Sequence, residues 1–362
     1  MTSTQLRRKD VWFALVLLAL LSVTVWVGRR PAHEPAPPAG SVPLDDETAR
    51  AELELIEQRY PAQRDSGNLD QALTEITRVV EKYPGYAAAR VQMALVLAET
   101  GRSESAYIHL KKCLDLDNQQ PNVELLAGTF AMQLNDLTGS AHHFSRAVGL
   151  APENGEYRVY LAQVQIRRHQ FDAARMTLLD ALRLDSSLHE AYFSLADVFA
   201  RQNELQLALQ QVQKAIENTP IAERKKQIGY ILRKAKLLQR MNQPEQSLQT
   251  LRHIPARRRQ ELDVLEEMAI SWNLLKRPEK SAELYEQVLA QRPTQWRLAA
   301  GAARWQIASG EVEKARKHLE RIQYLDSEAP AIPNLEKQIQ RLELERATRS
   351  PTDSGHNLDS CS

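Results

Sequence analysis

The chain has 362 residues, 47 of them basic and 46 acidic, which gives a formal net charge of +1. This balance gives no reason to expect nucleic acid as a partner. Its two cysteines, Cys113 and Cys361, cannot build a disulfide framework, and its nine histidines lack the spacing of a metal site.

Residues 1–10 form a short basic tail ahead of an uncharged apolar run, residues 11–28. At ~1.5 Å per residue this run spans roughly 27 Å as a helix, which is just enough to cross a bilayer. Trp12 and Trp26 lie near its two ends, where headgroups favour aromatic rings. The run predicts an uncleaved signal anchor, a single-pass transmembrane helix. A cleaved signal peptide is the alternative, but the run is long for one and no convincing cleavage site follows it.

Basic residues flank the anchor on both sides, with the larger charge ahead of it when the start amine is included. We therefore expect a cytoplasmic N-terminus and an extracytoplasmic remainder, periplasmic in a bacterium. Residues 29–50 are predicted to be a stalk, because five prolines between Pro31 and Pro43 favour polyproline II.

Small residues return at a fixed interval through residues 51–327. One set steps by 34 residues, and once by 39: Ala72, Ala106, Ser140, Ala174, Ala208, Ser247, Ser281 and Ala315. A second set lies twelve residues ahead of the first: Tyr60, Ala94, Gly128, Ala162, Ala196, Ala235, Ala269 and Ala303. Two small positions in a fixed period predict pairs of closely packed helices, each pair stacked on the next.

The pattern resembles the tetratricopeptide repeat, W-x2-L-G-x2-Y followed by A-x3-F-x2-A and a terminal P, over residues 53–327. The second half of the motif matches best, whereas the Trp, Leu and Gly are mostly absent. Tyr60, in place of a small residue, predicts a distorted first helix. The resemblance implies an all-α, right-handed superhelical solenoid of about eight helix pairs, here preceded by one transmembrane helix. It also implies a concave surface that binds peptides or partner helices.

The 39-residue step places five extra residues between Thr219 and Ile231. Thr219 and Pro220 suit a helix start, so we expect the first helix of this pair to be longer by more than one turn. Pro255 should shorten the second helix. Residues 222–259 contain eleven Lys or Arg and two Glu, which indicates a solvated face or a site for an acidic protein or anionic headgroups.

Residues 334–348 are predicted to form a capping helix, with Asn334 as its N-cap and Leu335 and Ile339 on its apolar stripe. Residues 349–362 have little to bury, and we expect them to be disordered.

Catalytic, cofactor-binding and metal-binding motifs are absent from the sequence, so we expect no enzyme and no cofactor. By the resemblance, partner-binding residues lie on the side of each first helix that faces away from its paired helix: Val91, Leu95, Leu125, Leu126, Met132, Tyr160, Gln163, Arg233, Lys236 and Arg240. The first five form an apolar groove, unless neighbouring helices or the N-terminal segment cover them. The last three grip a partner carboxylate, unless they pair with Asp263, Glu266 and Glu267 in an intramolecular ladder.

The sequence therefore predicts a membrane-tethered scaffold that binds protein or peptide partners to assemble a complex, of the envelope biogenesis or secretion type. The alternative is an anchored receptor whose repeats face the cytosol and capture client or precursor segments. A third hypothesis is regulation of an enzyme through the basic residues near Arg233.

Overall fold

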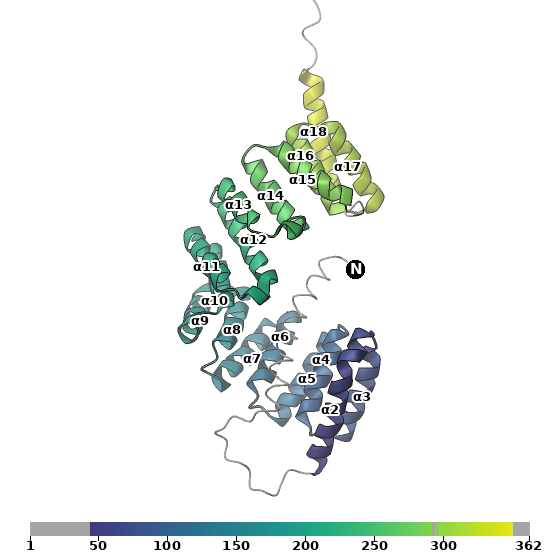
Figure 1. The fold of residues 1–362 in the computed structure, drawn as a ribbon, viewed down its shortest axis with the longest axis vertical. Coiled ribbons are helices and arrows are strands. Elements are labelled where there is room, and N and C mark those ends of the chain that lie inside the picture. The colour runs from purple at the N-terminus through teal and green to yellow at the C-terminus, as the bar shows by residue number, and fades with distance from the viewer. Residues whose placement is uncertain (1–43, 292–293, 295, 350–362) are drawn as a thin grey trace, which may run out of the picture. The chain divides into compact units, whose positions relative to one another are not determined.

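The computed structural model describes residues 44–291, 294 and 296–349, and the regular structure of these residues is helical (Figure 1). They form seventeen α-helices, arranged as eight successive pairs and one final helix. In chain order these are α2 (Leu44–Asp65), α3 (Leu69–Lys82), α4 (Ala87–Glu99), α5 (Ser103–Leu116), α6 (Pro121–Gln133), α7 (Leu137–Leu150), α8 (Gly155–Arg167), α9 (Phe171–Leu184), α10 (His189–Arg201), α11 (Leu205–Asn218), α12 (Arg224–Arg240), α13 (Pro244–Arg252), α14 (Leu262–Leu274), α15 (Pro278–Gln291), α16 (Trp296–Ser309), α17 (Val312–Leu325) and α18 (Ile332–Arg349).

The chain divides into two compact units, Met1–Ser194 and Leu195–Ser362. Within each unit, consecutive helices pack on one another in chain order. The all-helical repeat fold predicted from the period is confirmed, and the right-handed superhelix stays a prediction.

The small residues of both periodic sets are buried where the paired helices approach, with Tyr60 as the exception. Ala94 of α4 and Ala106 of α5, for example, each expose 0% of their surface. A larger side chain at these positions would hold the two backbones apart. The period therefore identified the contact between paired helices correctly.

Each turn between paired helices contains one residue in the left-handed region: Gly67, Gly101, Asn135, His169, Asn203, Asn242, Lys276 and Gly310. The following N–H then donates back to the helix, as from Arg102 to the Leu97 carbonyl at 2.9 Å. This geometry satisfies carbonyls that would otherwise lack a partner at the helix end. Glycine adopts it without strain, whereas Lys276 adopts it with φ 57°.

Lys276→Gly is expected to raise the free energy of unfolding by about 1 kcal/mol, because glycine removes the left-handed strain. Gly101→Ala is the matched control, and we expect it to lower the free energy of unfolding by a similar amount. A Cβ on Gly101 would meet nothing within 4 Å, so its cost would come from the backbone alone. Urea unfolding followed by circular dichroism measures both. Equal stabilities of both variants and the parent would contradict the account.

The 39-residue unit has the predicted form. A short 3-10 helix, η1 (Ile221–Glu223), precedes α12, which has 17 residues where α14 has 13. Helix α13 has only 9 residues and is followed by a second 3-10 helix, η2 (Ala256–Arg258). Pro255 directly precedes η2, so the second helix ends early as expected.

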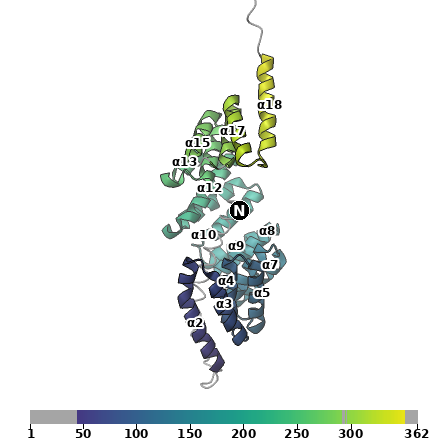
Figure 2. The same cartoon turned by 90° about the vertical axis from the view of Figure 1, so that its right-hand side faces the viewer.

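The two ends differ from the predicted boundaries. Helix α2 begins at Leu44, within the range predicted as stalk, and is continuous through Tyr60 and Pro61, so the distortion predicted at Tyr60 does not interrupt the helix. Helix α18 begins before Asn334, which accepts a hydrogen bond from Gln338 instead of capping the helix. Leu335 and Ile339 of α18 are buried in one cluster with residues of α16 and α17. Its second half extends beyond those helices (Figures 1 and 2).

None of the described helices has the length and apolar character needed to cross a membrane. The basic tail, the predicted anchor at residues 11–28 and most of the predicted stalk lie outside the described residues, as does the tail from residue 350.

Candidate partner-binding surface

In the first unit, two contacts hold the first helices α6 and α8 side by side. Near their N-terminal ends, the Tyr157 hydroxyl donates to Oδ1 of Asn122 at 2.5 Å. Near their C-terminal ends, Nη1 of Arg167 donates to the Met132 carbonyl at 3.2 Å. The two helices are therefore fastened at both ends, which fixes the surface between them.

The surface between these two contacts is the α6–α8 strip, formed by Leu125, Thr129 and Met132 of α6 and by Tyr160 and Gln163 of α8. All five residues are half-buried. The Thr129 hydroxyl donates to the Leu125 carbonyl at 2.8 Å, and the Tyr160 ring lies 5.8 Å from that of Phe144. Among the described residues, the Gln163 side-chain amide has no hydrogen bond. The strip thus combines apolar contact area with an amide able to bond a peptide backbone.

Three of the residues predicted to line an apolar groove are buried. Val91 exposes 4%, Leu95 2% and Leu126 4% of their surfaces, and all three belong to one cluster with residues of α2 to α6. Neighbouring helices cover them, so they are packing residues rather than a binding wall. Of the five apolar candidates, Leu125 and Met132 keep exposed surface.

The three predicted cations of α12 are engaged within the second unit. Nη2 of Arg233 donates to Asp197 at 2.5 Å, and Nζ of Lys236 lies 3.2 Å from Oε1 of Glu267. Arg240 donates to the Ala200 carbonyl at 3.3 Å. The structure therefore favours the intramolecular ladder over a grip on a partner carboxylate.

The ladder continues toward α14 and α16. Burial raises the pKa of the Glu266 carboxyl, and the neighbouring Glu267 raises it further, whereas Lys236, Arg304 and Arg297 oppose the shift. Acidic side chains of α14 are thus surrounded by cations from the first helices on either side. This is the alternation of charge that the sequence predicted.

Arg167 and Arg240 play equivalent roles that the sequence interpretation missed. Each occupies the same place in its repeat and donates to the carbonyl of Met132 or Ala200, which in turn share one place in the preceding first helix. A guanidinium at a helix C-terminus satisfies a free carbonyl and favours the helix dipole. The recurrence of Arg at this repeat position was the available signal.

A buried charged network lies among α5, α6 and α7. Glu124 exposes 0% of its surface, and its carboxylate lies 2.7 Å from Nδ1 of His143 and 2.7 Å from Nε of Arg146. Nε2 of His143 is 3.1 Å from the Tyr107 hydroxyl, whose pKa burial raises. This network could not be predicted from the sequence, because the spacing between Tyr107, Glu124, His143 and Arg146 follows neither the repeat period nor a known motif.

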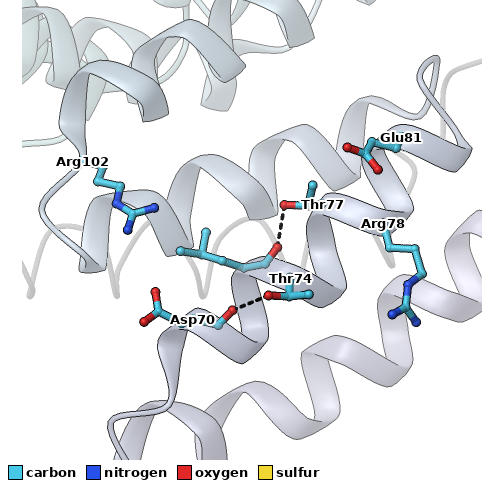
Figure 3. A pocket seen from close by; sticks show the side chains of 7 residues that line it. Asp70, Thr74, Thr77, Arg78, Glu81 and Arg102 are labelled. Atoms are coloured by element: carbon cyan, nitrogen blue, oxygen red, sulfur yellow. Dashed lines mark hydrogen bonds between the residues drawn. The ribbon is translucent and has the colours of Figure 1, made fainter.

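A surface hollow of about 450 Å³ follows α3 and the start of α5 (Figure 3). Leu73 is one of its lining residues, and the hydroxyls of Thr74 and Thr77 donate to carbonyls of their own helix. Asp70 and Arg102 are among its other lining residues, so both signs of charge are present. The hollow therefore has no net preference for an anionic or a cationic ligand.

Two family models, both described as tetratricopeptide repeat, match the chain. One covers residues 275–339, and the other covers residues 60–121, 125–189 and 161–222. A comparison with curated proteins gave no match.

Several solved structures are similar to the chain. PilW, described as a widely conserved type IV pilus biogenesis factor, has a TM-score of 0.51 at 15% identity, covering 60% of this chain and 96% of PilW. For PilF of Pseudomonas aeruginosa the TM-score is 0.49 at 18% identity, covering 62% of this chain and 98% of PilF. YrrB is described as having an unusual peptide-binding site. Its TM-score is 0.40 at 18% identity, and the match covers 48% of this chain and 94% of YrrB. At these identities the likeness to PilW shows the fold alone. With its buried small residues and its paired helices, the chain belongs to the tetratricopeptide repeat family.

Proposed function

We propose that this protein is a membrane-tethered scaffold that holds an extended or amphipathic segment of a partner protein on the α6–α8 strip. The observation that supports this most directly is the strip itself. It is bordered by two contacts between helices, and it leaves Leu125, Met132 and the Gln163 amide accessible.

The chemistry of the strip suits a peptide. Leu125 and Met132 supply apolar surface, and Met in particular adapts to different side chains. The half-buried Tyr160 supplies a rigid aromatic contact. Because Arg167 and Tyr157 already fix the two helices, little further ordering accompanies binding.

The proposed tether determines the compartment in which the partner is bound. In this proposal, residues 11–28 anchor the chain in the bilayer and the repeats lie outside the cytoplasm. There they assemble a complex of the envelope biogenesis or secretion type. Binding rather than catalysis is the role of this repeat fold, and the buried polar groups of the Glu124 network are packed among three helices.

A photocrosslinker at Gln163 of the full-length protein in its native membrane tests the proposal. We expect one dominant partner, captured from Gln163 and not from Gln210, an exposed glutamine of α11 that serves as the matched control. Leu126 would be a poor position, because it is buried. Tyr160→Ala should weaken binding of the purified partner at least about tenfold, as is usual for aromatic residues at the centre of an interface.

Two results would contradict partner binding at the α6–α8 strip. One is equal capture from Gln163 and Gln210, and the other is capture that survives both Tyr160→Ala and Leu125→Asp in variants with unchanged circular dichroism. The compartment of the captured partner separates the two predicted roles. A cytosolic precursor would favour the receptor, and an exported protein would favour the scaffold.

A further inference from the structure

A second group of cations lies at one end of the α12–α13 pair. Helix α13 runs back along α12, and Ile228 near the start of α12 shares a buried cluster with Ile254 just after α13. The start of α12, the end of α13 and the η2 turn therefore lie together. We call this the basic end, formed by Arg224, Lys225, Arg252, Arg257, Arg258 and Arg259.

Several of these cations differ from the Arg233 ladder in what they contact. Arg258 pairs with Glu261, and Nε of Arg259 donates to the Ile254 carbonyl at 2.7 Å. Arg224, Arg252 and Arg257 are exposed, and none of them has an ion pair among the described residues. These three charges are thus available to an external anion.

An apolar side chain projects beside these cations. Ile221, in the η1 turn directly before α12, exposes 81% of its surface. The adjoining Pro220 and Ala222 are also exposed. An exposed aliphatic residue beside unpaired arginines can enter the headgroup boundary of a bilayer while the cations bind its phosphates.

We infer that the basic end docks on anionic lipid headgroups, with Ile221 inserting between them. The cations lie on turns and helix ends, which suit a flat surface better than a bound peptide. The inference uses the proposed tether for local concentration, whereas the contact itself depends only on the described residues.

The expected strength follows from the charges. Each cation near an anionic bilayer increases binding roughly fivefold, and the attraction is screened beyond a Debye length of about 10 Å at moderate salt. Docking should therefore require anionic lipid and weaken as salt is added.

The test places an environment-sensitive fluorophore at Ile221→Cys in the full-length chain, reconstituted in vesicles that carry lipid-linked quenchers. Cys361→Ser removes one native thiol. The other, Cys113, is fully buried, and burial raises its thiol pKa to about 12, so it does not react. Tyr324→Cys is the control label, because Tyr324 exposes 89% in the same unit.

We expect quenching at position 221 in vesicles that contain phosphatidylglycerol and not in phosphatidylcholine alone, with no quenching at position 324. Arg224→Glu combined with Arg257→Glu should abolish it. Arg168→Glu combined with Lys317→Glu changes the net charge equally at exposed sites elsewhere and should leave it intact. Absence of quenching in anionic vesicles, or equal loss from both charge-reversed pairs, would overturn the inference.

Flotation of the same chain with phosphatidylcholine vesicles at high salt reports the tether separately. If the chain floats there but position 221 is not quenched in anionic vesicles, the tether is supported and the docking is contradicted. If the chain floats only with anionic lipid at low salt and is quenched there, the docking is supported and the tether is contradicted.

Discussion

Glu124→Ala is expected to lower the free energy of unfolding by about 1–3 kcal/mol. The Glu124 carboxylate is fully buried, and His143 and Arg146 both lie 2.7 Å from it. Removing it leaves the half-buried His143 and the Arg146 guanidinium without their partner, and a lost buried partner costs more than the pair contributes. Urea unfolding followed by circular dichroism gives the difference.

The control for this change is Glu104→Ala, which removes an exposed carboxylate from the first turn of α5. We expect it to change stability by less than about 0.5 kcal/mol. The double variant Glu124→Ala with His143→Ala should lose less than the sum of its two single changes, because the partners share one network. Additive losses, or equal effects of Glu104→Ala and Glu124→Ala, would show that the network contributes no coupling.

Gly128→Ala is expected to cost about 1–3 kcal/mol, although alanine is the better helix former. A Cβ on Gly128 would lie 2.6 Å from two ring atoms of Phe144. The ring is fully buried and has little room to move away, so overpacking outweighs the gain of about 1 kcal/mol in helix propensity. Thermal and urea unfolding measure the net loss.

The other repeats suggest a second substitution that should compensate for this change. In most repeats an alanine at the equivalent position faces a smaller residue, as in Ala94 with Leu110 and Ala162 with Leu178, and Ala269 with Tyr285 is the exception. Phe144→Leu alone should leave a void and cost about 1 kcal/mol or more. Gly128→Ala combined with Phe144→Leu should recover the parent stability. A double variant as unstable as the sum of its parts would place the contact elsewhere.

The fold could be predicted because its packing repeats in the sequence. Ala106 and Ala174 are small for the same reason and are buried to the same degree, so a period of 34 residues identifies both. The left-handed turns could not be predicted as a set. His169 and Lys276 adopt the conformation of Gly101 without the residue type that signals it.

The candidate surface could be predicted only in part. Val91, Leu95 and Leu126 were assigned to an open face, but a first helix packs against its own partner and also against the neighbouring pairs. Its buried stripe is therefore wider than that of a helix at the edge of a bundle. The ladder was correct for Lys236 and Glu267, whereas Arg233 pairs backward along the chain with Asp197.

The contact of Arg167 with α6 is made to a backbone carbonyl, so it does not depend on which side chain position 132 carries. The same holds for Arg240 and position 200. Met132 can therefore be replaced during evolution without losing the contact between α6 and α8. The partner preference of the α6–α8 strip can thus change at position 132 while this stabilising contact is kept.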